Sequence, residues 1–194
     1  MLPLRNDLFN QATESVARTL LGCYLCRETE AGLVSGIIVE TEAYLSINDP
    51  ACHASRGKTR RNAAMFGSPG NAYVYFVYGK YYCFNVVTRP EGIGEAVLIR
   101  AVEPVEGIDI MKKRRGISSG ITELASGPGK LCQAFAIDKS FDGHNLQEKP
   151  LYLADSGEPD DRIRVTATLR IGITSAQDKM LRFMVDGNKF VSRR

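Results

Sequence analysis

The sequence predicts an α+β fold, in which one mixed domain over residues 1–194 is built around a curved, mostly antiparallel sheet. Two observations lead to this fold class. Segments with strand character come in groups, with helical segments between and after them, so the regular strand–helix alternation of a parallel sheet is missing. The length of 194 residues and a hydrophobic content of 44% also suit one domain with its own core.

The N-terminal half is predicted to contain a helix, two strands and a long loop, over residues 10–21, 21–27, 33–44 and 45–70. Asn10 is placed to cap the helix and Gly22 to end it. A turn at Ala31-Gly32 joins the two strands. The loop combines Pro, Gly, Ser and Arg with weak periodicity, which is typical of a functional loop with room for one short helix.

The clearest strand signal is a hairpin formed by residues 72–78 and 81–88, which are rich in aromatic and β-branched side chains. Gly79-Lys80 lies between them, and a two-residue loop with glycine first predicts a type II′ turn.

Further strands are predicted over residues 95–103, 150–154, 162–173 and 182–186, and helices over 104–115 and 128–136. Both helices are expected to begin with a proline, because the missing N–H costs nothing at the first helical position.

Strand 33–44 carries the first candidate site residues. Alternation predicts that one of its faces is formed by Ile38, Glu40, Glu42 and Tyr44, and the core face by Ile37, Val39, Thr41 and Ala43. Two glutamates that lead through a tyrosine into a basic loop indicate a cleft, although a solvated strand face would give the same pattern. The pattern does not choose between Glu40 and Glu42.

Asn85 and Arg100 lie inside apolar strands, where a polar side chain needs a partner. Arg100 is expected to pair with Glu40 or Glu42, either in a site or in a structural salt bridge. The turn between the hairpin strands is flanked by Tyr78 and Tyr81. This composition suits a wedge between base pairs, and it equally suits two tyrosines that pack on each other.

The net charge of +3 is small, but the cations are clustered in two segments, residues 56–61 and 112–115. Such clusters can neutralise phosphates, or they can simply cover a solvated surface. The sequence Ser126-Gly-Pro-Gly-Lys130 opens a predicted helix, whose free N–H groups and lysine suit an anion.

Five cysteines are present, at positions 23, 26, 52, 83 and 132, and their spacing is irregular. Cys23 and Cys26 resemble half a zinc site, but no second pair follows and the two histidines give no matching ligand spacing. Reduced thiols in a cytoplasmic protein are therefore expected. Neither a signal peptide nor a membrane-spanning segment is predicted.

Five motifs, in their order and spacing, resemble the alkyladenine (3-methyladenine) DNA glycosylase family, the mammalian-type methylpurine glycosylases also found in bacteria. They are Ile38-Val-Glu-Thr-Glu-Ala-Tyr44, Arg61-Asn62 with Met65-Phe66, Tyr73-Val-Tyr-Phe-Val-Tyr-Gly79, Val97-Leu-Ile-Arg-Ala101 with Glu103-Pro104, and Ser126-Gly-Pro-Gly-Lys-Leu-Cys-Gln-Ala134. The resemblance implies a single domain around a curved antiparallel sheet with a protruding β-hairpin. It departs at Lys80, in the basic loop and in the C-terminal third.

The resemblance also implies roles for individual residues. Glu42 would be the general base, and Arg100 would help to hold the attacking water together with a backbone carbonyl near Ile171. The pocket for the flipped base would be formed by Tyr44, His53, Tyr75, Asn85 and Ile171. Tyr78 would fill the gap left in the duplex. The basic segments, rather than the resemblance, predict the phosphate-binding residues, which are Lys58, Arg60, Arg61, Lys80 and Lys130.

These roles describe a monofunctional DNA glycosylase that hydrolyses the N-glycosidic bond of alkylated or deaminated purines and so initiates base excision repair. Its expected partner is double-stranded DNA containing damaged purines, and it is expected to act as a monomer without a metal or cofactor, in the cytoplasm or, in a bacterium, with the nucleoid. The alternative is a non-catalytic nucleic-acid-binding domain that uses the same hairpin and basic loops.

Overall fold

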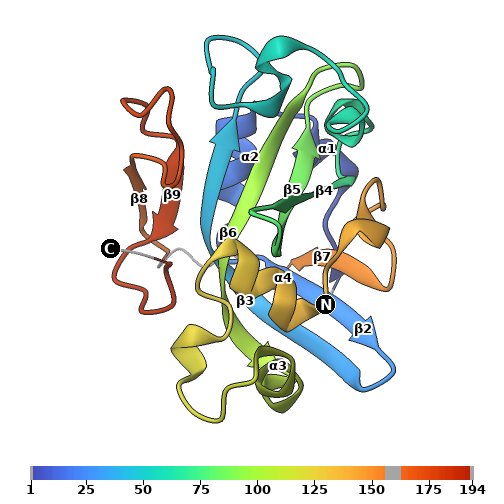
Figure 1. Ribbon diagram of the computed structural model, residues 1–194, viewed down its shortest axis with the longest axis vertical. Coiled ribbons are helices and arrows are strands. Elements are labelled where there is room, and N and C mark those ends of the chain that lie inside the picture. The colour runs from blue at the N-terminus through green and yellow to red at the C-terminus, as the bar shows by residue number, and fades with distance from the viewer. Residues whose placement is uncertain (1, 156–162, 193–194) are drawn as a thin grey trace.

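One antiparallel sheet of nine strands organises residues 2–155 and 163–192, which are the residues that the computed structural model describes. The strands are β1 (Leu2–Pro3), β2 (Tyr24–Thr29), β3 (Gly32–Tyr44), β4 (Ala72–Val77), β5 (Tyr81–Thr88), β6 (Glu95–Glu106), β7 (Leu151–Asp155), β8 (Val165–Thr168) and β9 (Arg182–Val185). Their order is β1-β7-β2-β3-β6-β5-β4, and β9 pairs with both β3 and β8 (Figure 1). The predicted α+β fold with a curved antiparallel sheet is confirmed.

The helices in the described ranges are α1 (Asn6–Phe9), α2 (Thr13–Thr19), α3 (Ile108–Arg115) and α4 (Pro128–Phe135), with short 3₁₀ turns at His53–Arg56, Ala63–Phe66, Ile121–Glu123 and Lys139–Phe141. Buried side chains of α2, α4 and β5 share the main core, among them Val16, Leu131 and Phe84. Within the described part of the chain, no helix has the length and apolar character needed to cross a membrane.

A bulge in β3 changes which side chains share a face. Ile38 pairs with Val102 and Glu40 with Ala101, so Val39 is the extra residue. Ile38 lies in the main core, as does Ala43, whereas Val39 packs on the opposite side with Ala101. The predicted alternation is therefore wrong before the bulge and correct after it, and Glu42 and Tyr44 still lie on the face opposite the core.

The predicted helix from Pro104 is wrong at its start, because Pro104 belongs to β6 and the helix begins at Ile108. Pro104 pairs with Gly36 next to a second register shift in β3, an irregularity that accommodates a residue without an N–H. A Cβ at Gly36 would lie 2.5 Å from the carbonyl oxygen of Glu103, so the close approach of β3 and β6 requires glycine there. Helix α4 begins at Pro128 as predicted.

The N-terminal helix is shorter than predicted, because α2 begins at Thr13 and Asn10 follows the separate turn α1. The Thr13 hydroxyl donates to Glu95 at 2.5 Å and so ties the start of α2 to the sheet. Gly22 turns the chain with a φ of +88°, and as a result β2 begins at Tyr24 rather than at residue 21.

Strands β4 and β5 form the predicted antiparallel hairpin, but its turn is of another type. Positive φ angles occur at both Tyr78 (54°) and Gly79 (65°), and the Lys80 N–H donates to the Val77 carbonyl oxygen at 3.2 Å. Two central residues with positive φ are the mark of a type I′ turn, so the type II′ prediction is wrong.

The remaining predictions differ mainly in extent. The loop over 45–70 contains two 3₁₀ turns instead of one short helix, while β7 and β9 lie close to their predicted ranges. The predicted strand 162–173 is reduced to β8, which ends at Thr168, and residue 162 lies outside the described residues. The strand ends there because Arg170 and Ile171 turn inward to acidic partners.

Candidate active site

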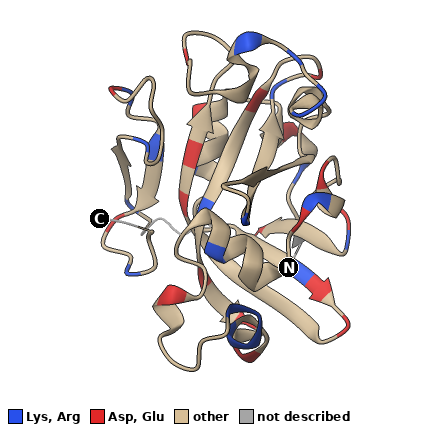
Figure 2. Cartoon of the chain, in the orientation of Figure 1, with Lys and Arg blue, Asp and Glu red and all other residues tan. Residues whose placement is uncertain are grey.

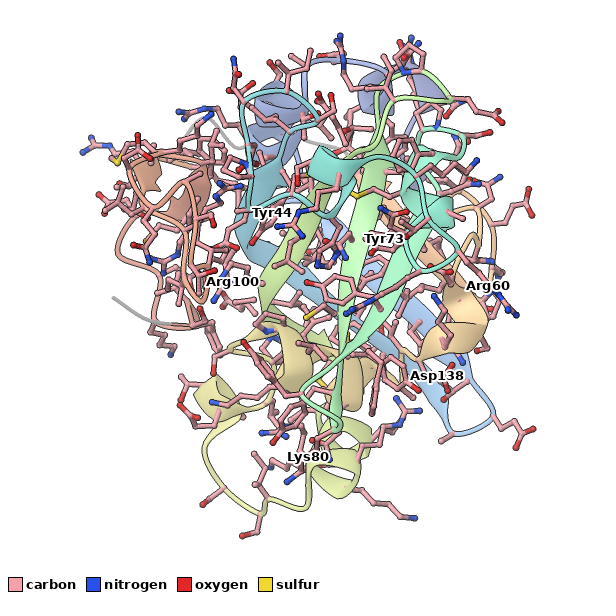
Figure 3. The ribbon with its side chains drawn as sticks, turned by 45° about the horizontal axis from the view of Figure 1, so that its top comes forward. Tyr44, Arg60, Tyr73, Lys80, Arg100 and Asp138 are labelled. Carbon is pink, nitrogen blue, oxygen red and sulfur yellow. The ribbon has the colours of Figure 1, made fainter. Side chains whose placement is uncertain are left out.

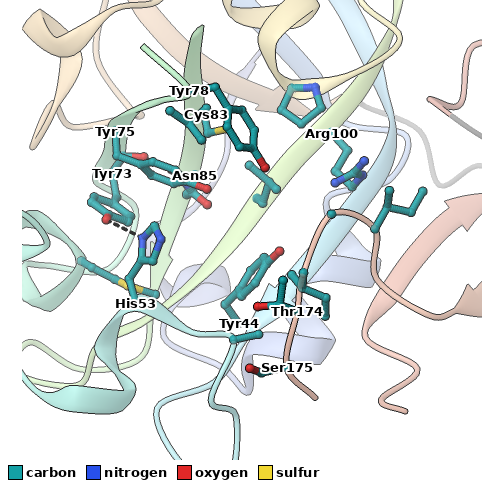
Figure 4. Close-up of a pocket in the computed structure, with 18 of the residues that line it drawn as sticks. Tyr44, His53, Tyr73, Tyr75, Tyr78, Cys83, Asn85, Arg100, Thr174 and Ser175 are labelled. Atoms are coloured by element: carbon teal, nitrogen blue, oxygen red, sulfur yellow. Dashed lines mark hydrogen bonds between the residues drawn. The ribbon is translucent and has the colours of Figure 1, made fainter. Parts of the chain in front are cut away.

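A cavity of about 530 Å³ opens on the face of the sheet opposite the main core. That volume lies in the range of sites for small organic groups such as a nucleobase. Its wall from the sheet is formed by alternate residues of β3, β4, β5 and β6, namely Tyr44, Tyr73, Tyr75, Cys83, Asn85, Leu98 and Arg100. Two loops and the hairpin complete it with His53, Arg61, Met65, Tyr78 and residues 171–175 (Figure 4).

Aromatic rings from the loop and from β4 form one side of the cavity. The His53 and Tyr75 ring centroids are 4.6 Å apart at an angle of 75°, and Tyr75 lies 5.4 Å from Tyr73. His53 Nδ1 and the Tyr73 hydroxyl lie 2.9 Å apart, which fixes the imidazole (Figure 4). Burial, together with the charge of Arg61, lowers the pKa of His53, so the ring is neutral at pH 7.

Glu42 lies behind this cavity and is completely buried. Its three partners all line the cavity. The Ile171 N–H donates to Oε1 at 2.8 Å, the Tyr44 hydroxyl donates to Oε2 at 2.8 Å, and Arg100 Nη1 lies 3.2 Å from Oε2. A carboxylate has about four lone-pair positions, so one on Oε1 is still free to accept a further hydrogen bond.

Burial raises the pKa of Glu42 above that of an ordinary glutamate, although Arg100, the Ile171 N–H and Tyr44 each act to lower it. A raised pKa in a buried carboxylate beside a cavity is typical of a group that exchanges protons in a reaction.

Glu40 is equally buried but has a different environment. Its Oε1 accepts from Arg100 Nε at 2.9 Å and from Arg182 Nε at 2.7 Å, and its Oε2 accepts from the Ser192 N–H at 2.6 Å. Burial alone would raise the pKa of Glu40, but Arg100, the Ser192 N–H and Arg182 together lower it below its usual range. Glu40 therefore stays ionised and serves as an anchor for cations.

Arg100 bridges the two carboxylates. The sequence predicted a pair with Glu40 or with Glu42, and in the structure Arg100 pairs with both. Its Nε contacts Glu40 and its Nη1 contacts Glu42, while Nη2 donates to the Ser192 hydroxyl at 3.3 Å. The side chain is only 8% exposed and that exposed part faces the cavity. One guanidinium thus holds the carboxylate cluster and presents a charge to the cavity.

The other predicted pocket residues also reach the cavity. Asn85 is buried, and its Nδ2 donates to the Tyr73 carbonyl oxygen at 2.9 Å, which sets the orientation of the amide. Ile171 lines the cavity through the loop after β8. Its N–H contacts Glu42, whereas the predicted contact of a nearby carbonyl with water stays a prediction. Tyr78, at the hairpin tip, borders the cavity and is 84% exposed.

Of the predicted phosphate-binding cations, one lines the cavity and the others lie outside it. Lys58, Arg60 and Arg61 are exposed in the loop after the first 3₁₀ turn, and Arg61 also lines the cavity. In Figure 3, Tyr44, Tyr73 and Arg100 gather over the middle of the sheet, whereas Arg60 and Lys80 lie toward the margins. The side chains of Lys58, Arg60, Arg61 and Lys80 are exposed, so phosphate binding by them stays a prediction.

Two of the basic features have protein partners. Lys130 forms an ion pair with Glu123 and lies 3.4 Å from the Ser126 hydroxyl, so part of its charge is already neutralised. The basic helix α3 is largely blue in Figure 2. Within it, Arg114 donates to the Ala134 carbonyl oxygen and Arg115 to Gln133, so these two side chains connect α3 to α4.

Sequence reasoning did not single out a buried ion pair beside the cavity. Arg170 Nη2 contacts Asp49 Oδ1 at 2.6 Å, and both side chains are completely buried. A signal for it existed: Arg170 stands between Leu169 and Ile171 in a predicted strand, as Arg100 stands between apolar neighbours. Tyr73 and Asn62 were also not assigned; the Asn62 amide donates to the His53 carbonyl oxygen at 2.8 Å and so shapes the loop.

The five cysteines are unpaired and buried. Burial raises the pKa of Cys23 to about 12 and those of Cys26 and Cys52 to about 11, and it also raises those of Cys83 and Cys132. Within the described ranges, no three His, Cys, Asp or Glu side chains are grouped as metal ligands would be.

Comparison with known proteins identifies relatives across nearly the whole chain. The sequence model of the family described as methylpurine-DNA glycosylase (MPG) matches residues 7–189. A protein of Carboxydothermus hydrogenoformans is 55% identical over 179 residues, which are 92% of this chain and 93% of the relative. Proteins of Methanoculleus marisnigri (48% identity, 96% of each chain) and Rhodopirellula baltica (47%, 97% of this chain and 82% of the relative) are also similar. All three carry the provisional name 3-methyladenine DNA glycosylase.

Proposed function

Because the chain belongs to the methylpurine-DNA glycosylase family, we propose that it removes alkylated purines from DNA by hydrolysis of the N-glycosidic bond, with Glu42 as the base that activates water. One observation carries this proposal: Glu42 is buried, yet each of its three partners lines a cavity large enough for a nucleobase. The chemistry needs such an arrangement, because a carboxylate must activate a water molecule beside the sugar carbon while the purine is held in the cavity.

The substrate base enters the cavity after it has left the duplex, since its sugar carbon cannot be attacked within the stack. Tyr44, His53 and Tyr75 then hold it by stacking, which contributes about 1–3 kcal/mol per base. An alkylated purine with a positive charge stacks better on electron-rich rings than a normal purine does. Asn85 beside the cavity is proposed to disfavour the amino group of normal guanine.

Water is proposed to bind to the free lone pair of Glu42 Oε1, close to Arg100. The ionised carboxylate takes the proton as the water oxygen attacks the sugar carbon and the purine leaves. The same negative charge stabilises the positive charge that develops on the sugar. Among the described residues that line the cavity there is no lysine that could form a Schiff base, so release of the base without strand cleavage is expected. We propose that the protein acts as a monomer, because one domain that holds one base needs no partner chain.

Incubation with duplex oligonucleotides that contain one 7-methylguanine, 3-methyladenine, hypoxanthine or ethenoadenine tests the proposal. The expected product is the free base and an abasic site, which breaks only after treatment with alkali. Specific binding of these duplexes without release of any base would support the alternative, a non-catalytic nucleic-acid-binding domain.

The pH dependence of base release is expected to show an acid limb above the usual range of a glutamate, because Glu42 must be ionised and burial raises its pKa. The rate is therefore lost as the pH falls through that raised pKa. Tyr44→Phe removes a hydrogen bond that favours the ionised form and should move the limb to higher pH. Single-turnover rates on 7-methylguanine, whose charge does not depend on this titration, provide the measurement; an unmoved limb would contradict the role of Tyr44.

Tyr78→Ala is expected to lower the rate of base release from duplex DNA by about tenfold or more, because the exposed ring no longer offsets the few kcal/mol needed to extrude a base. On single-stranded DNA the loss should be much smaller. Since Tyr78 has a positive φ, Tyr78→Gly is the matched control: it removes the ring without backbone strain and should show the same loss. Equal duplex and single-strand effects would argue against a wedge.

A further inference from the structure

The ion pair between Asp49 and Arg170 lies directly behind the cavity wall. Arg170 Nη1 donates to Asp49 Oδ2 at 2.7 Å and Nη2 to Oδ1 at 2.6 Å, and this two-point contact is fully buried. Nη1 also donates to the Ala43 carbonyl oxygen at 3.0 Å. Arg170 thus connects the loop after Tyr44 to the segment whose next residue, Ile171, donates to Glu42.

The guanidinium of Arg170 also stacks on Tyr44. Its Cζ lies 4.7 Å from the centroid of the Tyr44 ring. Tyr44 lines the cavity, whereas Arg170 has no exposed side-chain surface. The cation therefore covers the buried side of the ring, and the opposite side is available to a base.

A cation on one side of an aromatic ring competes with a cation on the other, because both are attracted by the same π electrons. Without a carboxylate partner, Arg170 would thus weaken the attraction of Tyr44 for a positively charged purine. The attraction of Tyr44 for a neutral purine would be nearly unchanged. The carboxylate of Asp49 accepts two hydrogen bonds from Arg170 and neutralises its positive charge.

We propose that Asp49 is a specificity-determining residue: it neutralises Arg170 behind Tyr44, so that the cavity keeps its preference for positively charged over neutral damaged purines. This inference rests on the proposed base release, and it concerns which lesions are preferred rather than whether release occurs.

Asp49→Asn is the central test, because it removes the charge and keeps one of the two oxygen acceptors for Arg170, while an amide NH₂ group replaces the other. We expect the ratio of single-turnover rates on 7-methylguanine, which is cationic, and hypoxanthine, which is neutral, to fall by about three- to tenfold, as expected for a partial loss of a cation–π interaction. Both lesions are placed in the same duplex sequence. Effects on phosphate binding or on the ionisation of Glu42 are common to both and cancel in the ratio.

Glu95→Gln is the matched control, since Glu95 also holds this loop, through the Ser46 hydroxyl at 2.8 Å, and is not part of the ion pair behind Tyr44. Its ratio should equal that of the wild type. The double variant Arg170→Met/Asp49→Leu removes both charges and should also keep a wild-type ratio, and it can be measured even if Asp49→Asn does not fold.

The outcomes separate the two proposals. If the wild type releases no base, the proposed function fails. If it does release bases, an unchanged ratio in folded Asp49→Asn overturns the inference, as does a lowered ratio in Glu95→Gln or in the double variant, because loop position rather than charge would then set the preference.

Discussion

Glu42→Gln is expected to lower single-turnover release of 7-methylguanine by about 10²- to 10⁴-fold, the usual contribution of a positioned general base. The amide oxygen of glutamine can still accept the Ile171 hydrogen bond, and Arg100 keeps its contact with Glu40. The variant should therefore fold and retain the cavity. What it loses is the ability to accept a proton from water and the negative charge opposite the developing positive charge of the sugar.

Three measurements define this experiment. Quenched-flow or gel assays give the rate of base release, fluorescence anisotropy with a lesion duplex gives binding, and thermal unfolding gives stability. We expect an unchanged affinity for the lesion duplex together with the loss of rate. Release of 7-methylguanine by Glu42→Gln at the wild-type rate would contradict the assignment of Glu42 as the general base.

The second large effect is expected on stability rather than on chemistry. Glu40→Gln should lower the free energy of unfolding by about 3–5 kcal/mol, the usual cost of breaking a buried ion pair by removing one partner. The neutral amide would face two buried guanidinium groups, those of Arg100 and Arg182, which Glu40 now holds at 2.9 and 2.7 Å. Urea unfolding at pH 7 gives the difference.

The pH dependence of stability tests the same account. Because the folded state lowers the pKa of Glu40, its contribution is present above the pKa of the unfolded chain and is lost as the pH falls through the folded value. Glu40→Gln should remove that part of the acid dependence, whereas Glu42→Gln should not. Equal stability of the Glu40 variant and the wild type would contradict the anchoring role.

Glu40 and Glu42 show how much of the site could be predicted from the sequence. Alternation along strand 33–44 correctly predicted that both glutamates face away from the core. The position of Arg100 inside an apolar strand correctly predicted that it pairs with a carboxylate. Selection between them depends on Ile171 and Ser192, which lie more than a hundred residues away along the chain. Such distant contacts follow from the tertiary fold and leave no local pattern.

Other differences have local causes that the pattern conceals. The bulge at Val39 needs a register shift between two strands, and a single strand sequence does not reveal its partner's register. Pro104 has the same favourable position at a helix start as Pro128, yet an irregular part of the sheet accommodates it. Tyr78 adopts a positive φ that only glycine and asparagine normally signal, so the turn type could not be predicted.

The burial of the cysteines has a consequence for survival under chemical stress. Agents that methylate purines also attack thiolates, and the thiolate rather than the thiol is the reactive form. With pKa values of about 11 to 12 at Cys23, Cys26 and Cys52, almost no thiolate exists at neutral pH, and little of each side chain is reachable. These three thiols are therefore expected to react slowly with the same electrophiles that create the proposed substrates.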